Sequence, residues 1–389
     1  MIALFAWELG AGRGHLEHIK PVLAALLNEG WSVVCAVRDY KGARSLLSDA
    51  SGAQCLGTLD LIQAPIFTHF SGPFSRPPAS IAEILAHIGF SDQSLLRPVV
   101  EDWSRIIETV RPDIIIGDFA PSVATAAQGQ IPIIMTGNGW TIPPDGTPIP
   151  ALPLRQYDAA IAREAERRIC EAVEAVSGAK WRPNSFAQLL RGDACFIYTS
   201  SVLDPYRDWR RDELSCPPNL VIPDGWKRNS ASHILLYLPR NHPSINRVLA
   251  AVGATGIKTY AYLGGSQPVS PPNVIIQPQP LDLPAMLPNA QLVVHHGGLG
   301  MANWCLAARK PQAVVPTDLE KSLIAHAIAT SKSGVIISPN TSNMVGSIMR
   351  AKALPATVAE ANFAHKTARE TIQAIMQKCD ALHIGGDGG

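Results

Sequence analysis

The chain has 389 residues, 47% of them apolar, and its 33 basic and 32 acidic side chains nearly balance. This length predicts about two domains, and without a basic excess we expect no nucleic-acid partner. No run of about 18 uninterrupted apolar residues is present, which argues against a transmembrane segment. The seven cysteines include no C-x-x-C pair, so we expect free thiols in the reducing cytoplasm rather than disulfides or a metal site.

The first half of the chain alternates apolar strands with helices, which predicts a parallel sheet covered on both faces. Four strands are expected here, at 2–7, 31–37, 113–119 and 131–137. The stretch 138–153 contains too much proline and glycine for regular structure. We expect it to form a long loop, and such loops in compact domains are often functional.

A second alternating series begins at residue 233, and its last amphipathic helix is expected at about 356–379. The polar stretch between the two series is broken by Pro and Gly. The sequence therefore predicts a domain at 1–215, a linker at 216–232, a second domain at 233–379 and a flexible tail at 380–389. Both domains are expected to be doubly wound, Rossmann-like α/β folds. Their ligands bind outside the carboxyl ends of the strands, so facing domains would line one cleft.

A glycine-rich turn, "GAGRGH", follows the first strand and places His15 at the start of a helix. A helix N-terminus lowers the pKa of a histidine, so a neutral imidazole can accept a proton near pH 7. The spacing differs from the dinucleotide pattern G-x-G-x-x-G, and no acidic residue ends the second strand, which disfavours a dinucleotide site. The alternative is an ordinary glycine turn with an N-terminal histidine.

Asp118 follows four apolar residues of the third predicted strand, at the carboxyl end of the sheet. The first strand of a doubly wound sheet is usually central, so this carboxylate is expected within reach of His15. It would orient the imidazole and stabilise its charged form. The alternative role for Asp118 is to cap the helix that begins near Pro121.

A second glycine turn, "HHGGLG", follows the strand at 292 and opens a helix. Backbone amides and the helix dipole at such a turn favour a phosphate group. We expect His296 to face the ligand because it directly precedes the glycines, and His295 to be a hydrogen-bonded core residue. Arg240, in the loop after residue 239, is a further candidate for a phosphate or base contact, with a solvated arginine as the alternative.

Three stretches resemble the GT-B glycosyltransferases, close to the UDP-glycosyltransferase and glycosyltransferase-28 groups. They are "GAGRGHLEHIKPVLAALLNEGWSVVCAV", "RPDIIIGDFAPSVATAAQGQIPII" and "PLDLPAMLPNAQLVVHHGGLGMANWCLAARKPQAVVPTDLEKSLIAHAI". The resemblance implies two facing Rossmann-like domains, with His15 as catalytic base and Asp118 as its partner. It implies that the donor is bound by His296 and by the backbone at the glycines, namely Gly12, Gly14, Gly297, Gly298 and Gly300.

The donor end departs from the family pattern. Met301 stands where the family has Thr or Ser. Trp304 stands where the family has a Glu that binds the ribose hydroxyls, and an indole cannot accept hydrogen bonds from those hydroxyls. The family's Asp-Gln pair, which holds sugar hydroxyls, falls on Glu320 and Lys321. We keep Met301, Glu320 and Lys321 as donor-binding positions and expect an altered donor preference. A deoxyribose nucleotide such as dTDP would lose less from the missing Glu.

The resemblance implies an inverting, metal-independent glycosyltransferase that moves a sugar from a UDP- or dTDP-linked donor to an acceptor hydroxyl, without a cofactor. The acceptor, a small molecule or a lipid-linked saccharide, is expected near His69, Phe70 and Trp140 in the first domain. Peripheral contact with a membrane is compatible with this assignment. Two alternatives stay open: a nucleotide-sugar hydrolase or epimerase on the same fold, and a non-catalytic binding protein.

Overall fold

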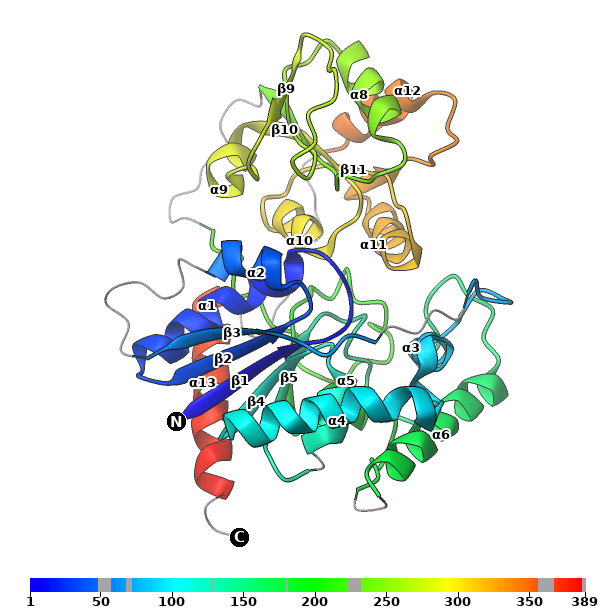
Figure 1. The fold of residues 1–389 in the computed structure, drawn as a ribbon. Coiled ribbons are helices and arrows are strands. Elements are labelled where there is room, and N and C mark those ends of the chain that lie inside the picture. Colours follow the sequence, from blue (N-terminus) through cyan, green and yellow to red (C-terminus); the bar gives the residue numbers. More distant parts are fainter. Residues whose placement is uncertain are drawn as a thin grey trace. The chain divides into compact units, whose positions relative to one another are not determined.

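The computed structural model describes residues 1–47, 57–67, 72–127, 129–178, 181–222, 232–355 and 367–386. The chain divides into two compact units (Figure 1). The first unit comprises Met1–Tyr198, Tyr206–Asn219 and Ala364–Gly389, and the second comprises Thr199–Pro205 and Leu220–Phe363. Neither unit is therefore one continuous segment of the chain.

Six parallel strands form the sheet of the first unit, in the order β3-β2-β1-β4-β5-β6. They are β1 (Ile2–Trp7), β2 (Ser32–Val37), β3 (Leu59–Gln63), β4 (Ile114–Asp118), β5 (Ile133–Gly137) and β6 (Ala194–Ile197). Trp7 at the end of β1 pairs with Asp118 at the end of β4. The strand order reverses at β1, and the crevice at such a reversal is where doubly wound sheets bind ligands.

Helices cover both faces of this sheet. The unit contains α1 (Gly14–Asn28), α2 (Tyr40–Leu47), α3 (Ile81–Leu85), the π-helical turn η1 (Ala86–Phe90), α4 (Gln93–Val110), α5 (Pro121–Ala127), α6 (Ala159–Val176), α7 (Gln188–Arg191) and α13 (Ala368–Gly386). Because side chains alternate along a strand, Phe5 packs with α1, α2 and α13, whereas Leu4 packs with α4 and α5. Figure 1 shows these two layers of helices.

The last helix differs from its expected place. We expected it at about 356–379 in the second domain, but α13 packs on the first unit, where Ile375 and Cys379 are fully buried. The Thr371 hydroxyl also donates a hydrogen bond to the Cys216 carbonyl oxygen over 2.8 Å. The helix extends into the stretch 380–386 that was expected to be a flexible tail. An amphipathic stripe predicts that a helix covers a core, but it does not identify which core.

The second unit repeats the architecture, with six parallel strands in the order β12-β11-β10-β7-β8-β9. The strands are β7 (His233–Tyr237), β8 (Thr259–Tyr262), β9 (Val274–Gln277), β10 (Ala290–His295), β11 (Gln312–Val314) and β12 (Gly334–Ile336). The helices are α8 (Ile245–Ala254), α9 (Leu283–Met286), the 3₁₀ turn η2 (Leu287–Asn289), α10 (Leu299–Ala307), α11 (Leu319–Thr330) and α12 (Met344–Lys352).

Two cores hold this unit together: α8 and α12 pack on one face of the sheet, and α10 and α11 pack on the other. The predicted fold class, two doubly wound α/β units, is confirmed. No helix in the described ranges is long and apolar enough to cross a membrane.

Candidate active site

His15 and Asp118 meet at the carboxyl edge of the first sheet. His15 is the second residue of α1 and Asp118 is the last residue of β4. The His15 Nδ1 atom lies 3.0 Å from Asp118 Oδ1, and the two side chains are 17% and 4% exposed. This contact assigns Nδ1 to the carboxylate and makes Nε2 the nitrogen that can take a proton from another molecule. The catalytic role of the pair stays a prediction.

Trp7 and Gly10 hold the His15 ring from two further sides. The Trp7 indole stacks on the imidazole, with ring centroids 5.0 Å apart. Gly10 has a φ of +82°, and a Cβ at this position would lie 2.6 Å from His15 Nε2. Glycine is therefore required at residue 10 both for its backbone conformation and for the space beside the ring. The other predicted donor-binding glycines of this turn, Gly12 and Gly14, have open space where a Cβ would stand.

Sequence analysis missed His18, which lies one turn after His15 on α1. Burial lowers the pKa of His18 to about 4, although the Asp118 carboxylate acts in the opposite direction. The His18 ring meets the Tyr198 ring edge-on, with centroids 5.7 Å apart. The three-residue spacing from His15 places both rings on one face of the helix and is the signal that could have identified His18.

The start of α5 is held by Glu8, which follows β1 and is fully buried. The Glu8 carboxylate accepts hydrogen bonds from the backbone N–H of Ser122, at 2.9 Å, and from the Ser122 hydroxyl. Burial raises the pKa of Glu8 to about 7. Glu8 thus performs the capping that we considered for Asp118, whose carboxylate instead contacts His15.

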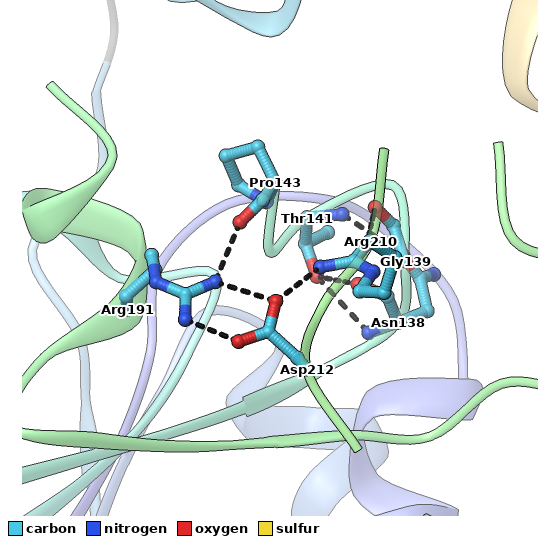
Figure 2. A network of polar contacts seen from close by, with 7 residues as sticks. All are labelled: Asn138, Gly139, Thr141, Pro143, Arg191, Arg210 and Asp212. Carbon is cyan, nitrogen blue, oxygen red and sulfur yellow. Dashed lines mark hydrogen bonds and ion pairs between the residues drawn. The ribbon is translucent and has the colours of Figure 1, made fainter. Parts of the chain in front are cut away.

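The proline-rich loop after β5 is ordered by a polar network around Asp212, shown in Figure 2. Arg191 donates to the Pro143 carbonyl oxygen over 2.9 Å and to Asp212, while Arg210 donates to the Gly139 carbonyl oxygen over 3.2 Å and to Asp212 over 3.3 Å. Burial alone would raise the pKa of Asp212, but the two arginines lower it. An ionised Asp212 therefore fixes the shape of the loop.

Aromatic side chains follow three strand ends in this unit: Phe67 comes after the edge strand β3, and Phe119 and Trp140 come after the neighbouring strands β4 and β5. All three are half-buried and pack on an apolar cluster that includes Leu9, from the turn between β1 and α1. They offer apolar surface at the edge of the sheet that carries His15. The predicted acceptor-binding residues His69 and Phe70 lie outside the described residues.

In the second unit, His295 fixes the glycine turn after β10. The backbone N–H of Gly297 donates to His295 Nδ1 over 3.1 Å, and His295 Nε2 lies 3.0 Å from Gln312 Oε1. The imidazole is therefore neutral and carries its hydrogen on Nε2. Burial lowers its pKa to about 3. The expected core position of His295 is confirmed, and the Gly297 amide is already engaged by it.

His296 lies over the start of α10. A Cβ on Gly298 would lie 3.1 Å from His296 Nε2. Burial, and then the Lys321 ammonium, lower the pKa of His296 to about 4. A hydrogen bond to the Tyr237 backbone acts in the opposite direction on this pKa. The first turn of α10, which includes Gly300, has backbone amides without an intrahelical acceptor. A neutral imidazole beside such amides is a suitable environment for an anion.

The remaining predicted donor residues differ in exposure. The side chains of Met301 and Trp304 are buried, each only 7% exposed. Arg240 is exposed in the loop after β7. Glu320 and Lys321 form an ion pair at the start of α11, with 2.7 Å between Glu320 Oε2 and Lys321 Nζ. Their roles toward a donor stay predictions. In the part of the chain that the structure describes, no group of three or more His, Cys, Asp or Glu side chains could hold a metal ion.

No family model and no curated protein matches the sequence, but many solved structures match the fold. The calicheamicin glycosyltransferase CalG4 has a TM-score of 0.64 and 15% identity, over 98% of this chain and 94% of its own. The spinosyn rhamnosyltransferase SpnG has a TM-score of 0.62 and 16% identity, over 98% and 100%. Glycosyltransferase VinC in complex with dTDP has a TM-score of 0.59 and 15% identity, over 98% and 99%. The chain therefore has, over nearly its whole length, the fold of GT-B glycosyltransferases.

Proposed function

We propose that this protein is an inverting glycosyltransferase that moves a sugar from a nucleoside-diphosphate donor to an acceptor hydroxyl. The observation that carries the proposal is the contact between His15 and Asp118 at the carboxyl edge of the first sheet. The shared fold with glycosyltransferases over 98% of the chain supports the reaction class.

His15 acts as the general base. Its Nε2 atom takes the proton of the acceptor hydroxyl while the oxygen attacks the anomeric carbon from the side opposite the leaving diphosphate. Asp118, almost fully buried, stabilises the imidazolium that forms. A placed general base contributes roughly two to four orders of magnitude in rate. Trp7 and Gly10 hold the ring in the orientation that this transfer requires.

The donor diphosphate binds at the glycine turn of the second unit. The first amides of α10 and the helix dipole stabilise the negative charge that develops on the leaving group. The His296 ring, whose Nε2 atom lies beside Gly298, donates a hydrogen bond to a phosphate oxygen. The dTDP bound to VinC supports a nucleoside diphosphate as ligand. Trp304 favours a nucleotide whose ribose lacks the 2′-hydroxyl, because an indole accepts no hydrogen bond.

The acceptor presents its hydroxyl from an apolar body, which packs on Phe67, Phe119 and Trp140. The structure of SpnG complexed with spinosyn aglycone supports an acceptor of this kind. A lipid-linked saccharide stays a second acceptor class, as does peripheral membrane contact. All six cysteines described by the structure are free thiols, which agrees with the proposed cytoplasmic location.

The proposal is tested by incubating the protein with UDP- and dTDP-linked sugars, with and without a panel of apolar alcohols. We expect a glycosylated product from the wild-type protein and none from His15→Ala. Release of free sugar without an acceptor, lost in the same variant, would instead identify a nucleotide-sugar hydrolase. A protein that binds no nucleotide and releases no sugar would contradict the proposal.

A further inference from the structure

Lys321 lies directly against the glycine turn of the second unit. A Cβ on Gly297 would lie 2.9 Å from the Lys321 carbonyl oxygen and 3.2 Å from Lys321 Cβ. The Asp318 carboxylate accepts the Lys321 backbone N–H over 3.0 Å and so caps α11. The position of residue 321 beside the turn is therefore fixed by backbone contacts rather than by the flexible side chain.

The ammonium of Lys321 has an exchangeable partner. Nζ pairs with the Glu320 carboxylate at 2.7 Å, and the two side chains are 19% and 26% exposed. A pair between such partly exposed side chains contributes little to stability, so a ligand of higher negative charge can displace Glu320. The charge of Lys321 also acts on the turn, because it adds to burial in lowering the pKa of His296.

The turn has few hydrogen-bond donors for a diphosphate. Met301 is buried and offers no hydroxyl, and the Gly297 amide already donates to His295. Of the fully charged groups that act on His296, Lys321 is cationic and Asp318 is anionic, and the nearby Glu320 adds a second carboxylate. Lys321 is thus a side chain able to supply positive charge at this turn.

We propose that Lys321 leaves Glu320 when the donor binds and pairs with the phosphate that carries the sugar, in place of the hydroxyl absent at residue 301. This inference rests on the proposed function and specifies the ligand of one residue. A charge-assisted hydrogen bond to this phosphate also stabilises the leaving group as its charge develops.

Calorimetry with UDP, dTDP, UMP and dTMP tests the assignment, because the monophosphates lack the second phosphate. We expect Lys321→Gln to weaken binding of the preferred diphosphate by about tenfold to a hundredfold, the range for a hydrogen bond to a charged group. Binding of the matching monophosphate should change far less. Lys321→Arg should retain most of the preference for the diphosphate, because it keeps the charge. Glu320→Gln should bind the diphosphate more tightly, because Lys321 no longer has to leave a carboxylate.

The contrary outcomes are distinct. Equal loss for both nucleotides in a folded Lys321→Gln protein, or loss for neither, would overturn the assignment of Lys321 while leaving the proposed function standing. If the wild-type protein binds none of the four nucleotides, both the proposed function and this inference fail.

Discussion

Contacts from three sides restrain the His15 imidazole: Asp118 at Nδ1, Trp7 across one face of the ring and Gly10 beside Nε2. Three contacts, together with 17% exposure, fix both the tautomer and the direction in which a proton is taken. At the residue scale, the chemistry therefore depends on the positions of these neighbours as much as on the histidine.

His15→Ala is expected to lower the turnover of transfer by at least about a hundredfold and to leave nucleotide affinity unchanged, because the base acts on the acceptor. Asp118→Asn is expected to lower turnover less, because the base remains. Turnover and nucleotide calorimetry on both folded variants check this. Wild-type turnover in His15→Ala would end the proposed mechanism, and loss of folding in both variants would make the pair structural.

Gly10→Ala is expected to lower both turnover and the melting temperature. The positive φ alone costs about 1 kcal/mol, and the added methyl group would lie 2.6 Å from His15 Nε2. Gly14 provides the matched control, since a Cβ there meets nothing within 4 Å and alanine is the better helix former. A Gly10→Ala protein with wild-type turnover would show that the ring does not need its present position.

Buried and partly buried polar contacts join neighbouring elements at the carboxyl edge of the first sheet. Glu8 joins the end of β1 to the start of α5, and Arg191, paired with Asp212, joins α7 to the loop after β5. These contacts replace regular structure where the chain turns. At the scale of elements, they position the start of α5 and the loop that presents Trp140.

The free energy of unfolding is expected to fall as the pH rises from about 4.5 to 7, because burial raises the pKa of Glu8 from 4.5 to about 7 in the folded protein. The folded state then binds the proton that the unfolded state releases, so stability is greatest below the unfolded pKa. Glu8→Gln removes this contribution, on the order of 1–3 kcal/mol. Urea unfolding of both proteins at pH 5 and pH 8 measures it, and parallel curves would contradict the expectation.

Asp212→Ala is expected to destabilise the protein by about 1–3 kcal/mol, since it leaves two half-buried or buried guanidinium groups without their carboxylate. The Michaelis constant for the acceptor should rise while that for the donor stays constant, because the loop carrying Trp140 loses its anchor. The exposed pair Arg167–Glu164 on α6 is the control, and Glu164→Ala should leave the free energy of unfolding nearly unchanged. An unchanged acceptor constant would show that the network is structural only.

At the scale of the whole molecule, the chain crosses between its units more than once: residues 199–205 belong to the second unit, 206–219 to the first, and the final helix returns to the first. The alternating strands and helices were enough to predict two doubly wound units. β3 and β6 were missed because they are edge strands with partly exposed residues, so their apolar signal is weak.

The site residues that could be predicted are those whose signal lies in the neighbouring sequence. His15, Asp118 and the glycine turns stand at strand ends, which the sequence marks. Glu8 acquires its role from Ser122, which is more than 100 positions away in the sequence. Trp7 acquires its role by stacking on the His15 ring across the glycine turn. The use of the Gly297 amide depends on His295 and Gln312, and no local pattern specifies that contact.

Ile375→Ala in α13 is expected to lower the free energy of unfolding by about 2–5 kcal/mol, the usual cost of truncating a buried aliphatic side chain. Ile375 is fully buried in the core shared with α1, whereas Gln373 on the same helix is exposed. Gln373→Ala should therefore change stability by less than about 0.5 kcal/mol. Urea unfolding compares the two, and equal effects would mean that α13 does not belong to the first core.

The hydrogen bond between His295 and Gln312 has an evolutionary consequence. The two residues are 17 positions apart, yet a change at either one leaves the other with a buried polar atom that has lost its partner, at a cost of about 1–3 kcal/mol. A change of both to apolar residues of similar shape avoids that cost but releases the Gly297 amide. Descendants of this chain that keep the turn are therefore expected to keep both His295 and Gln312.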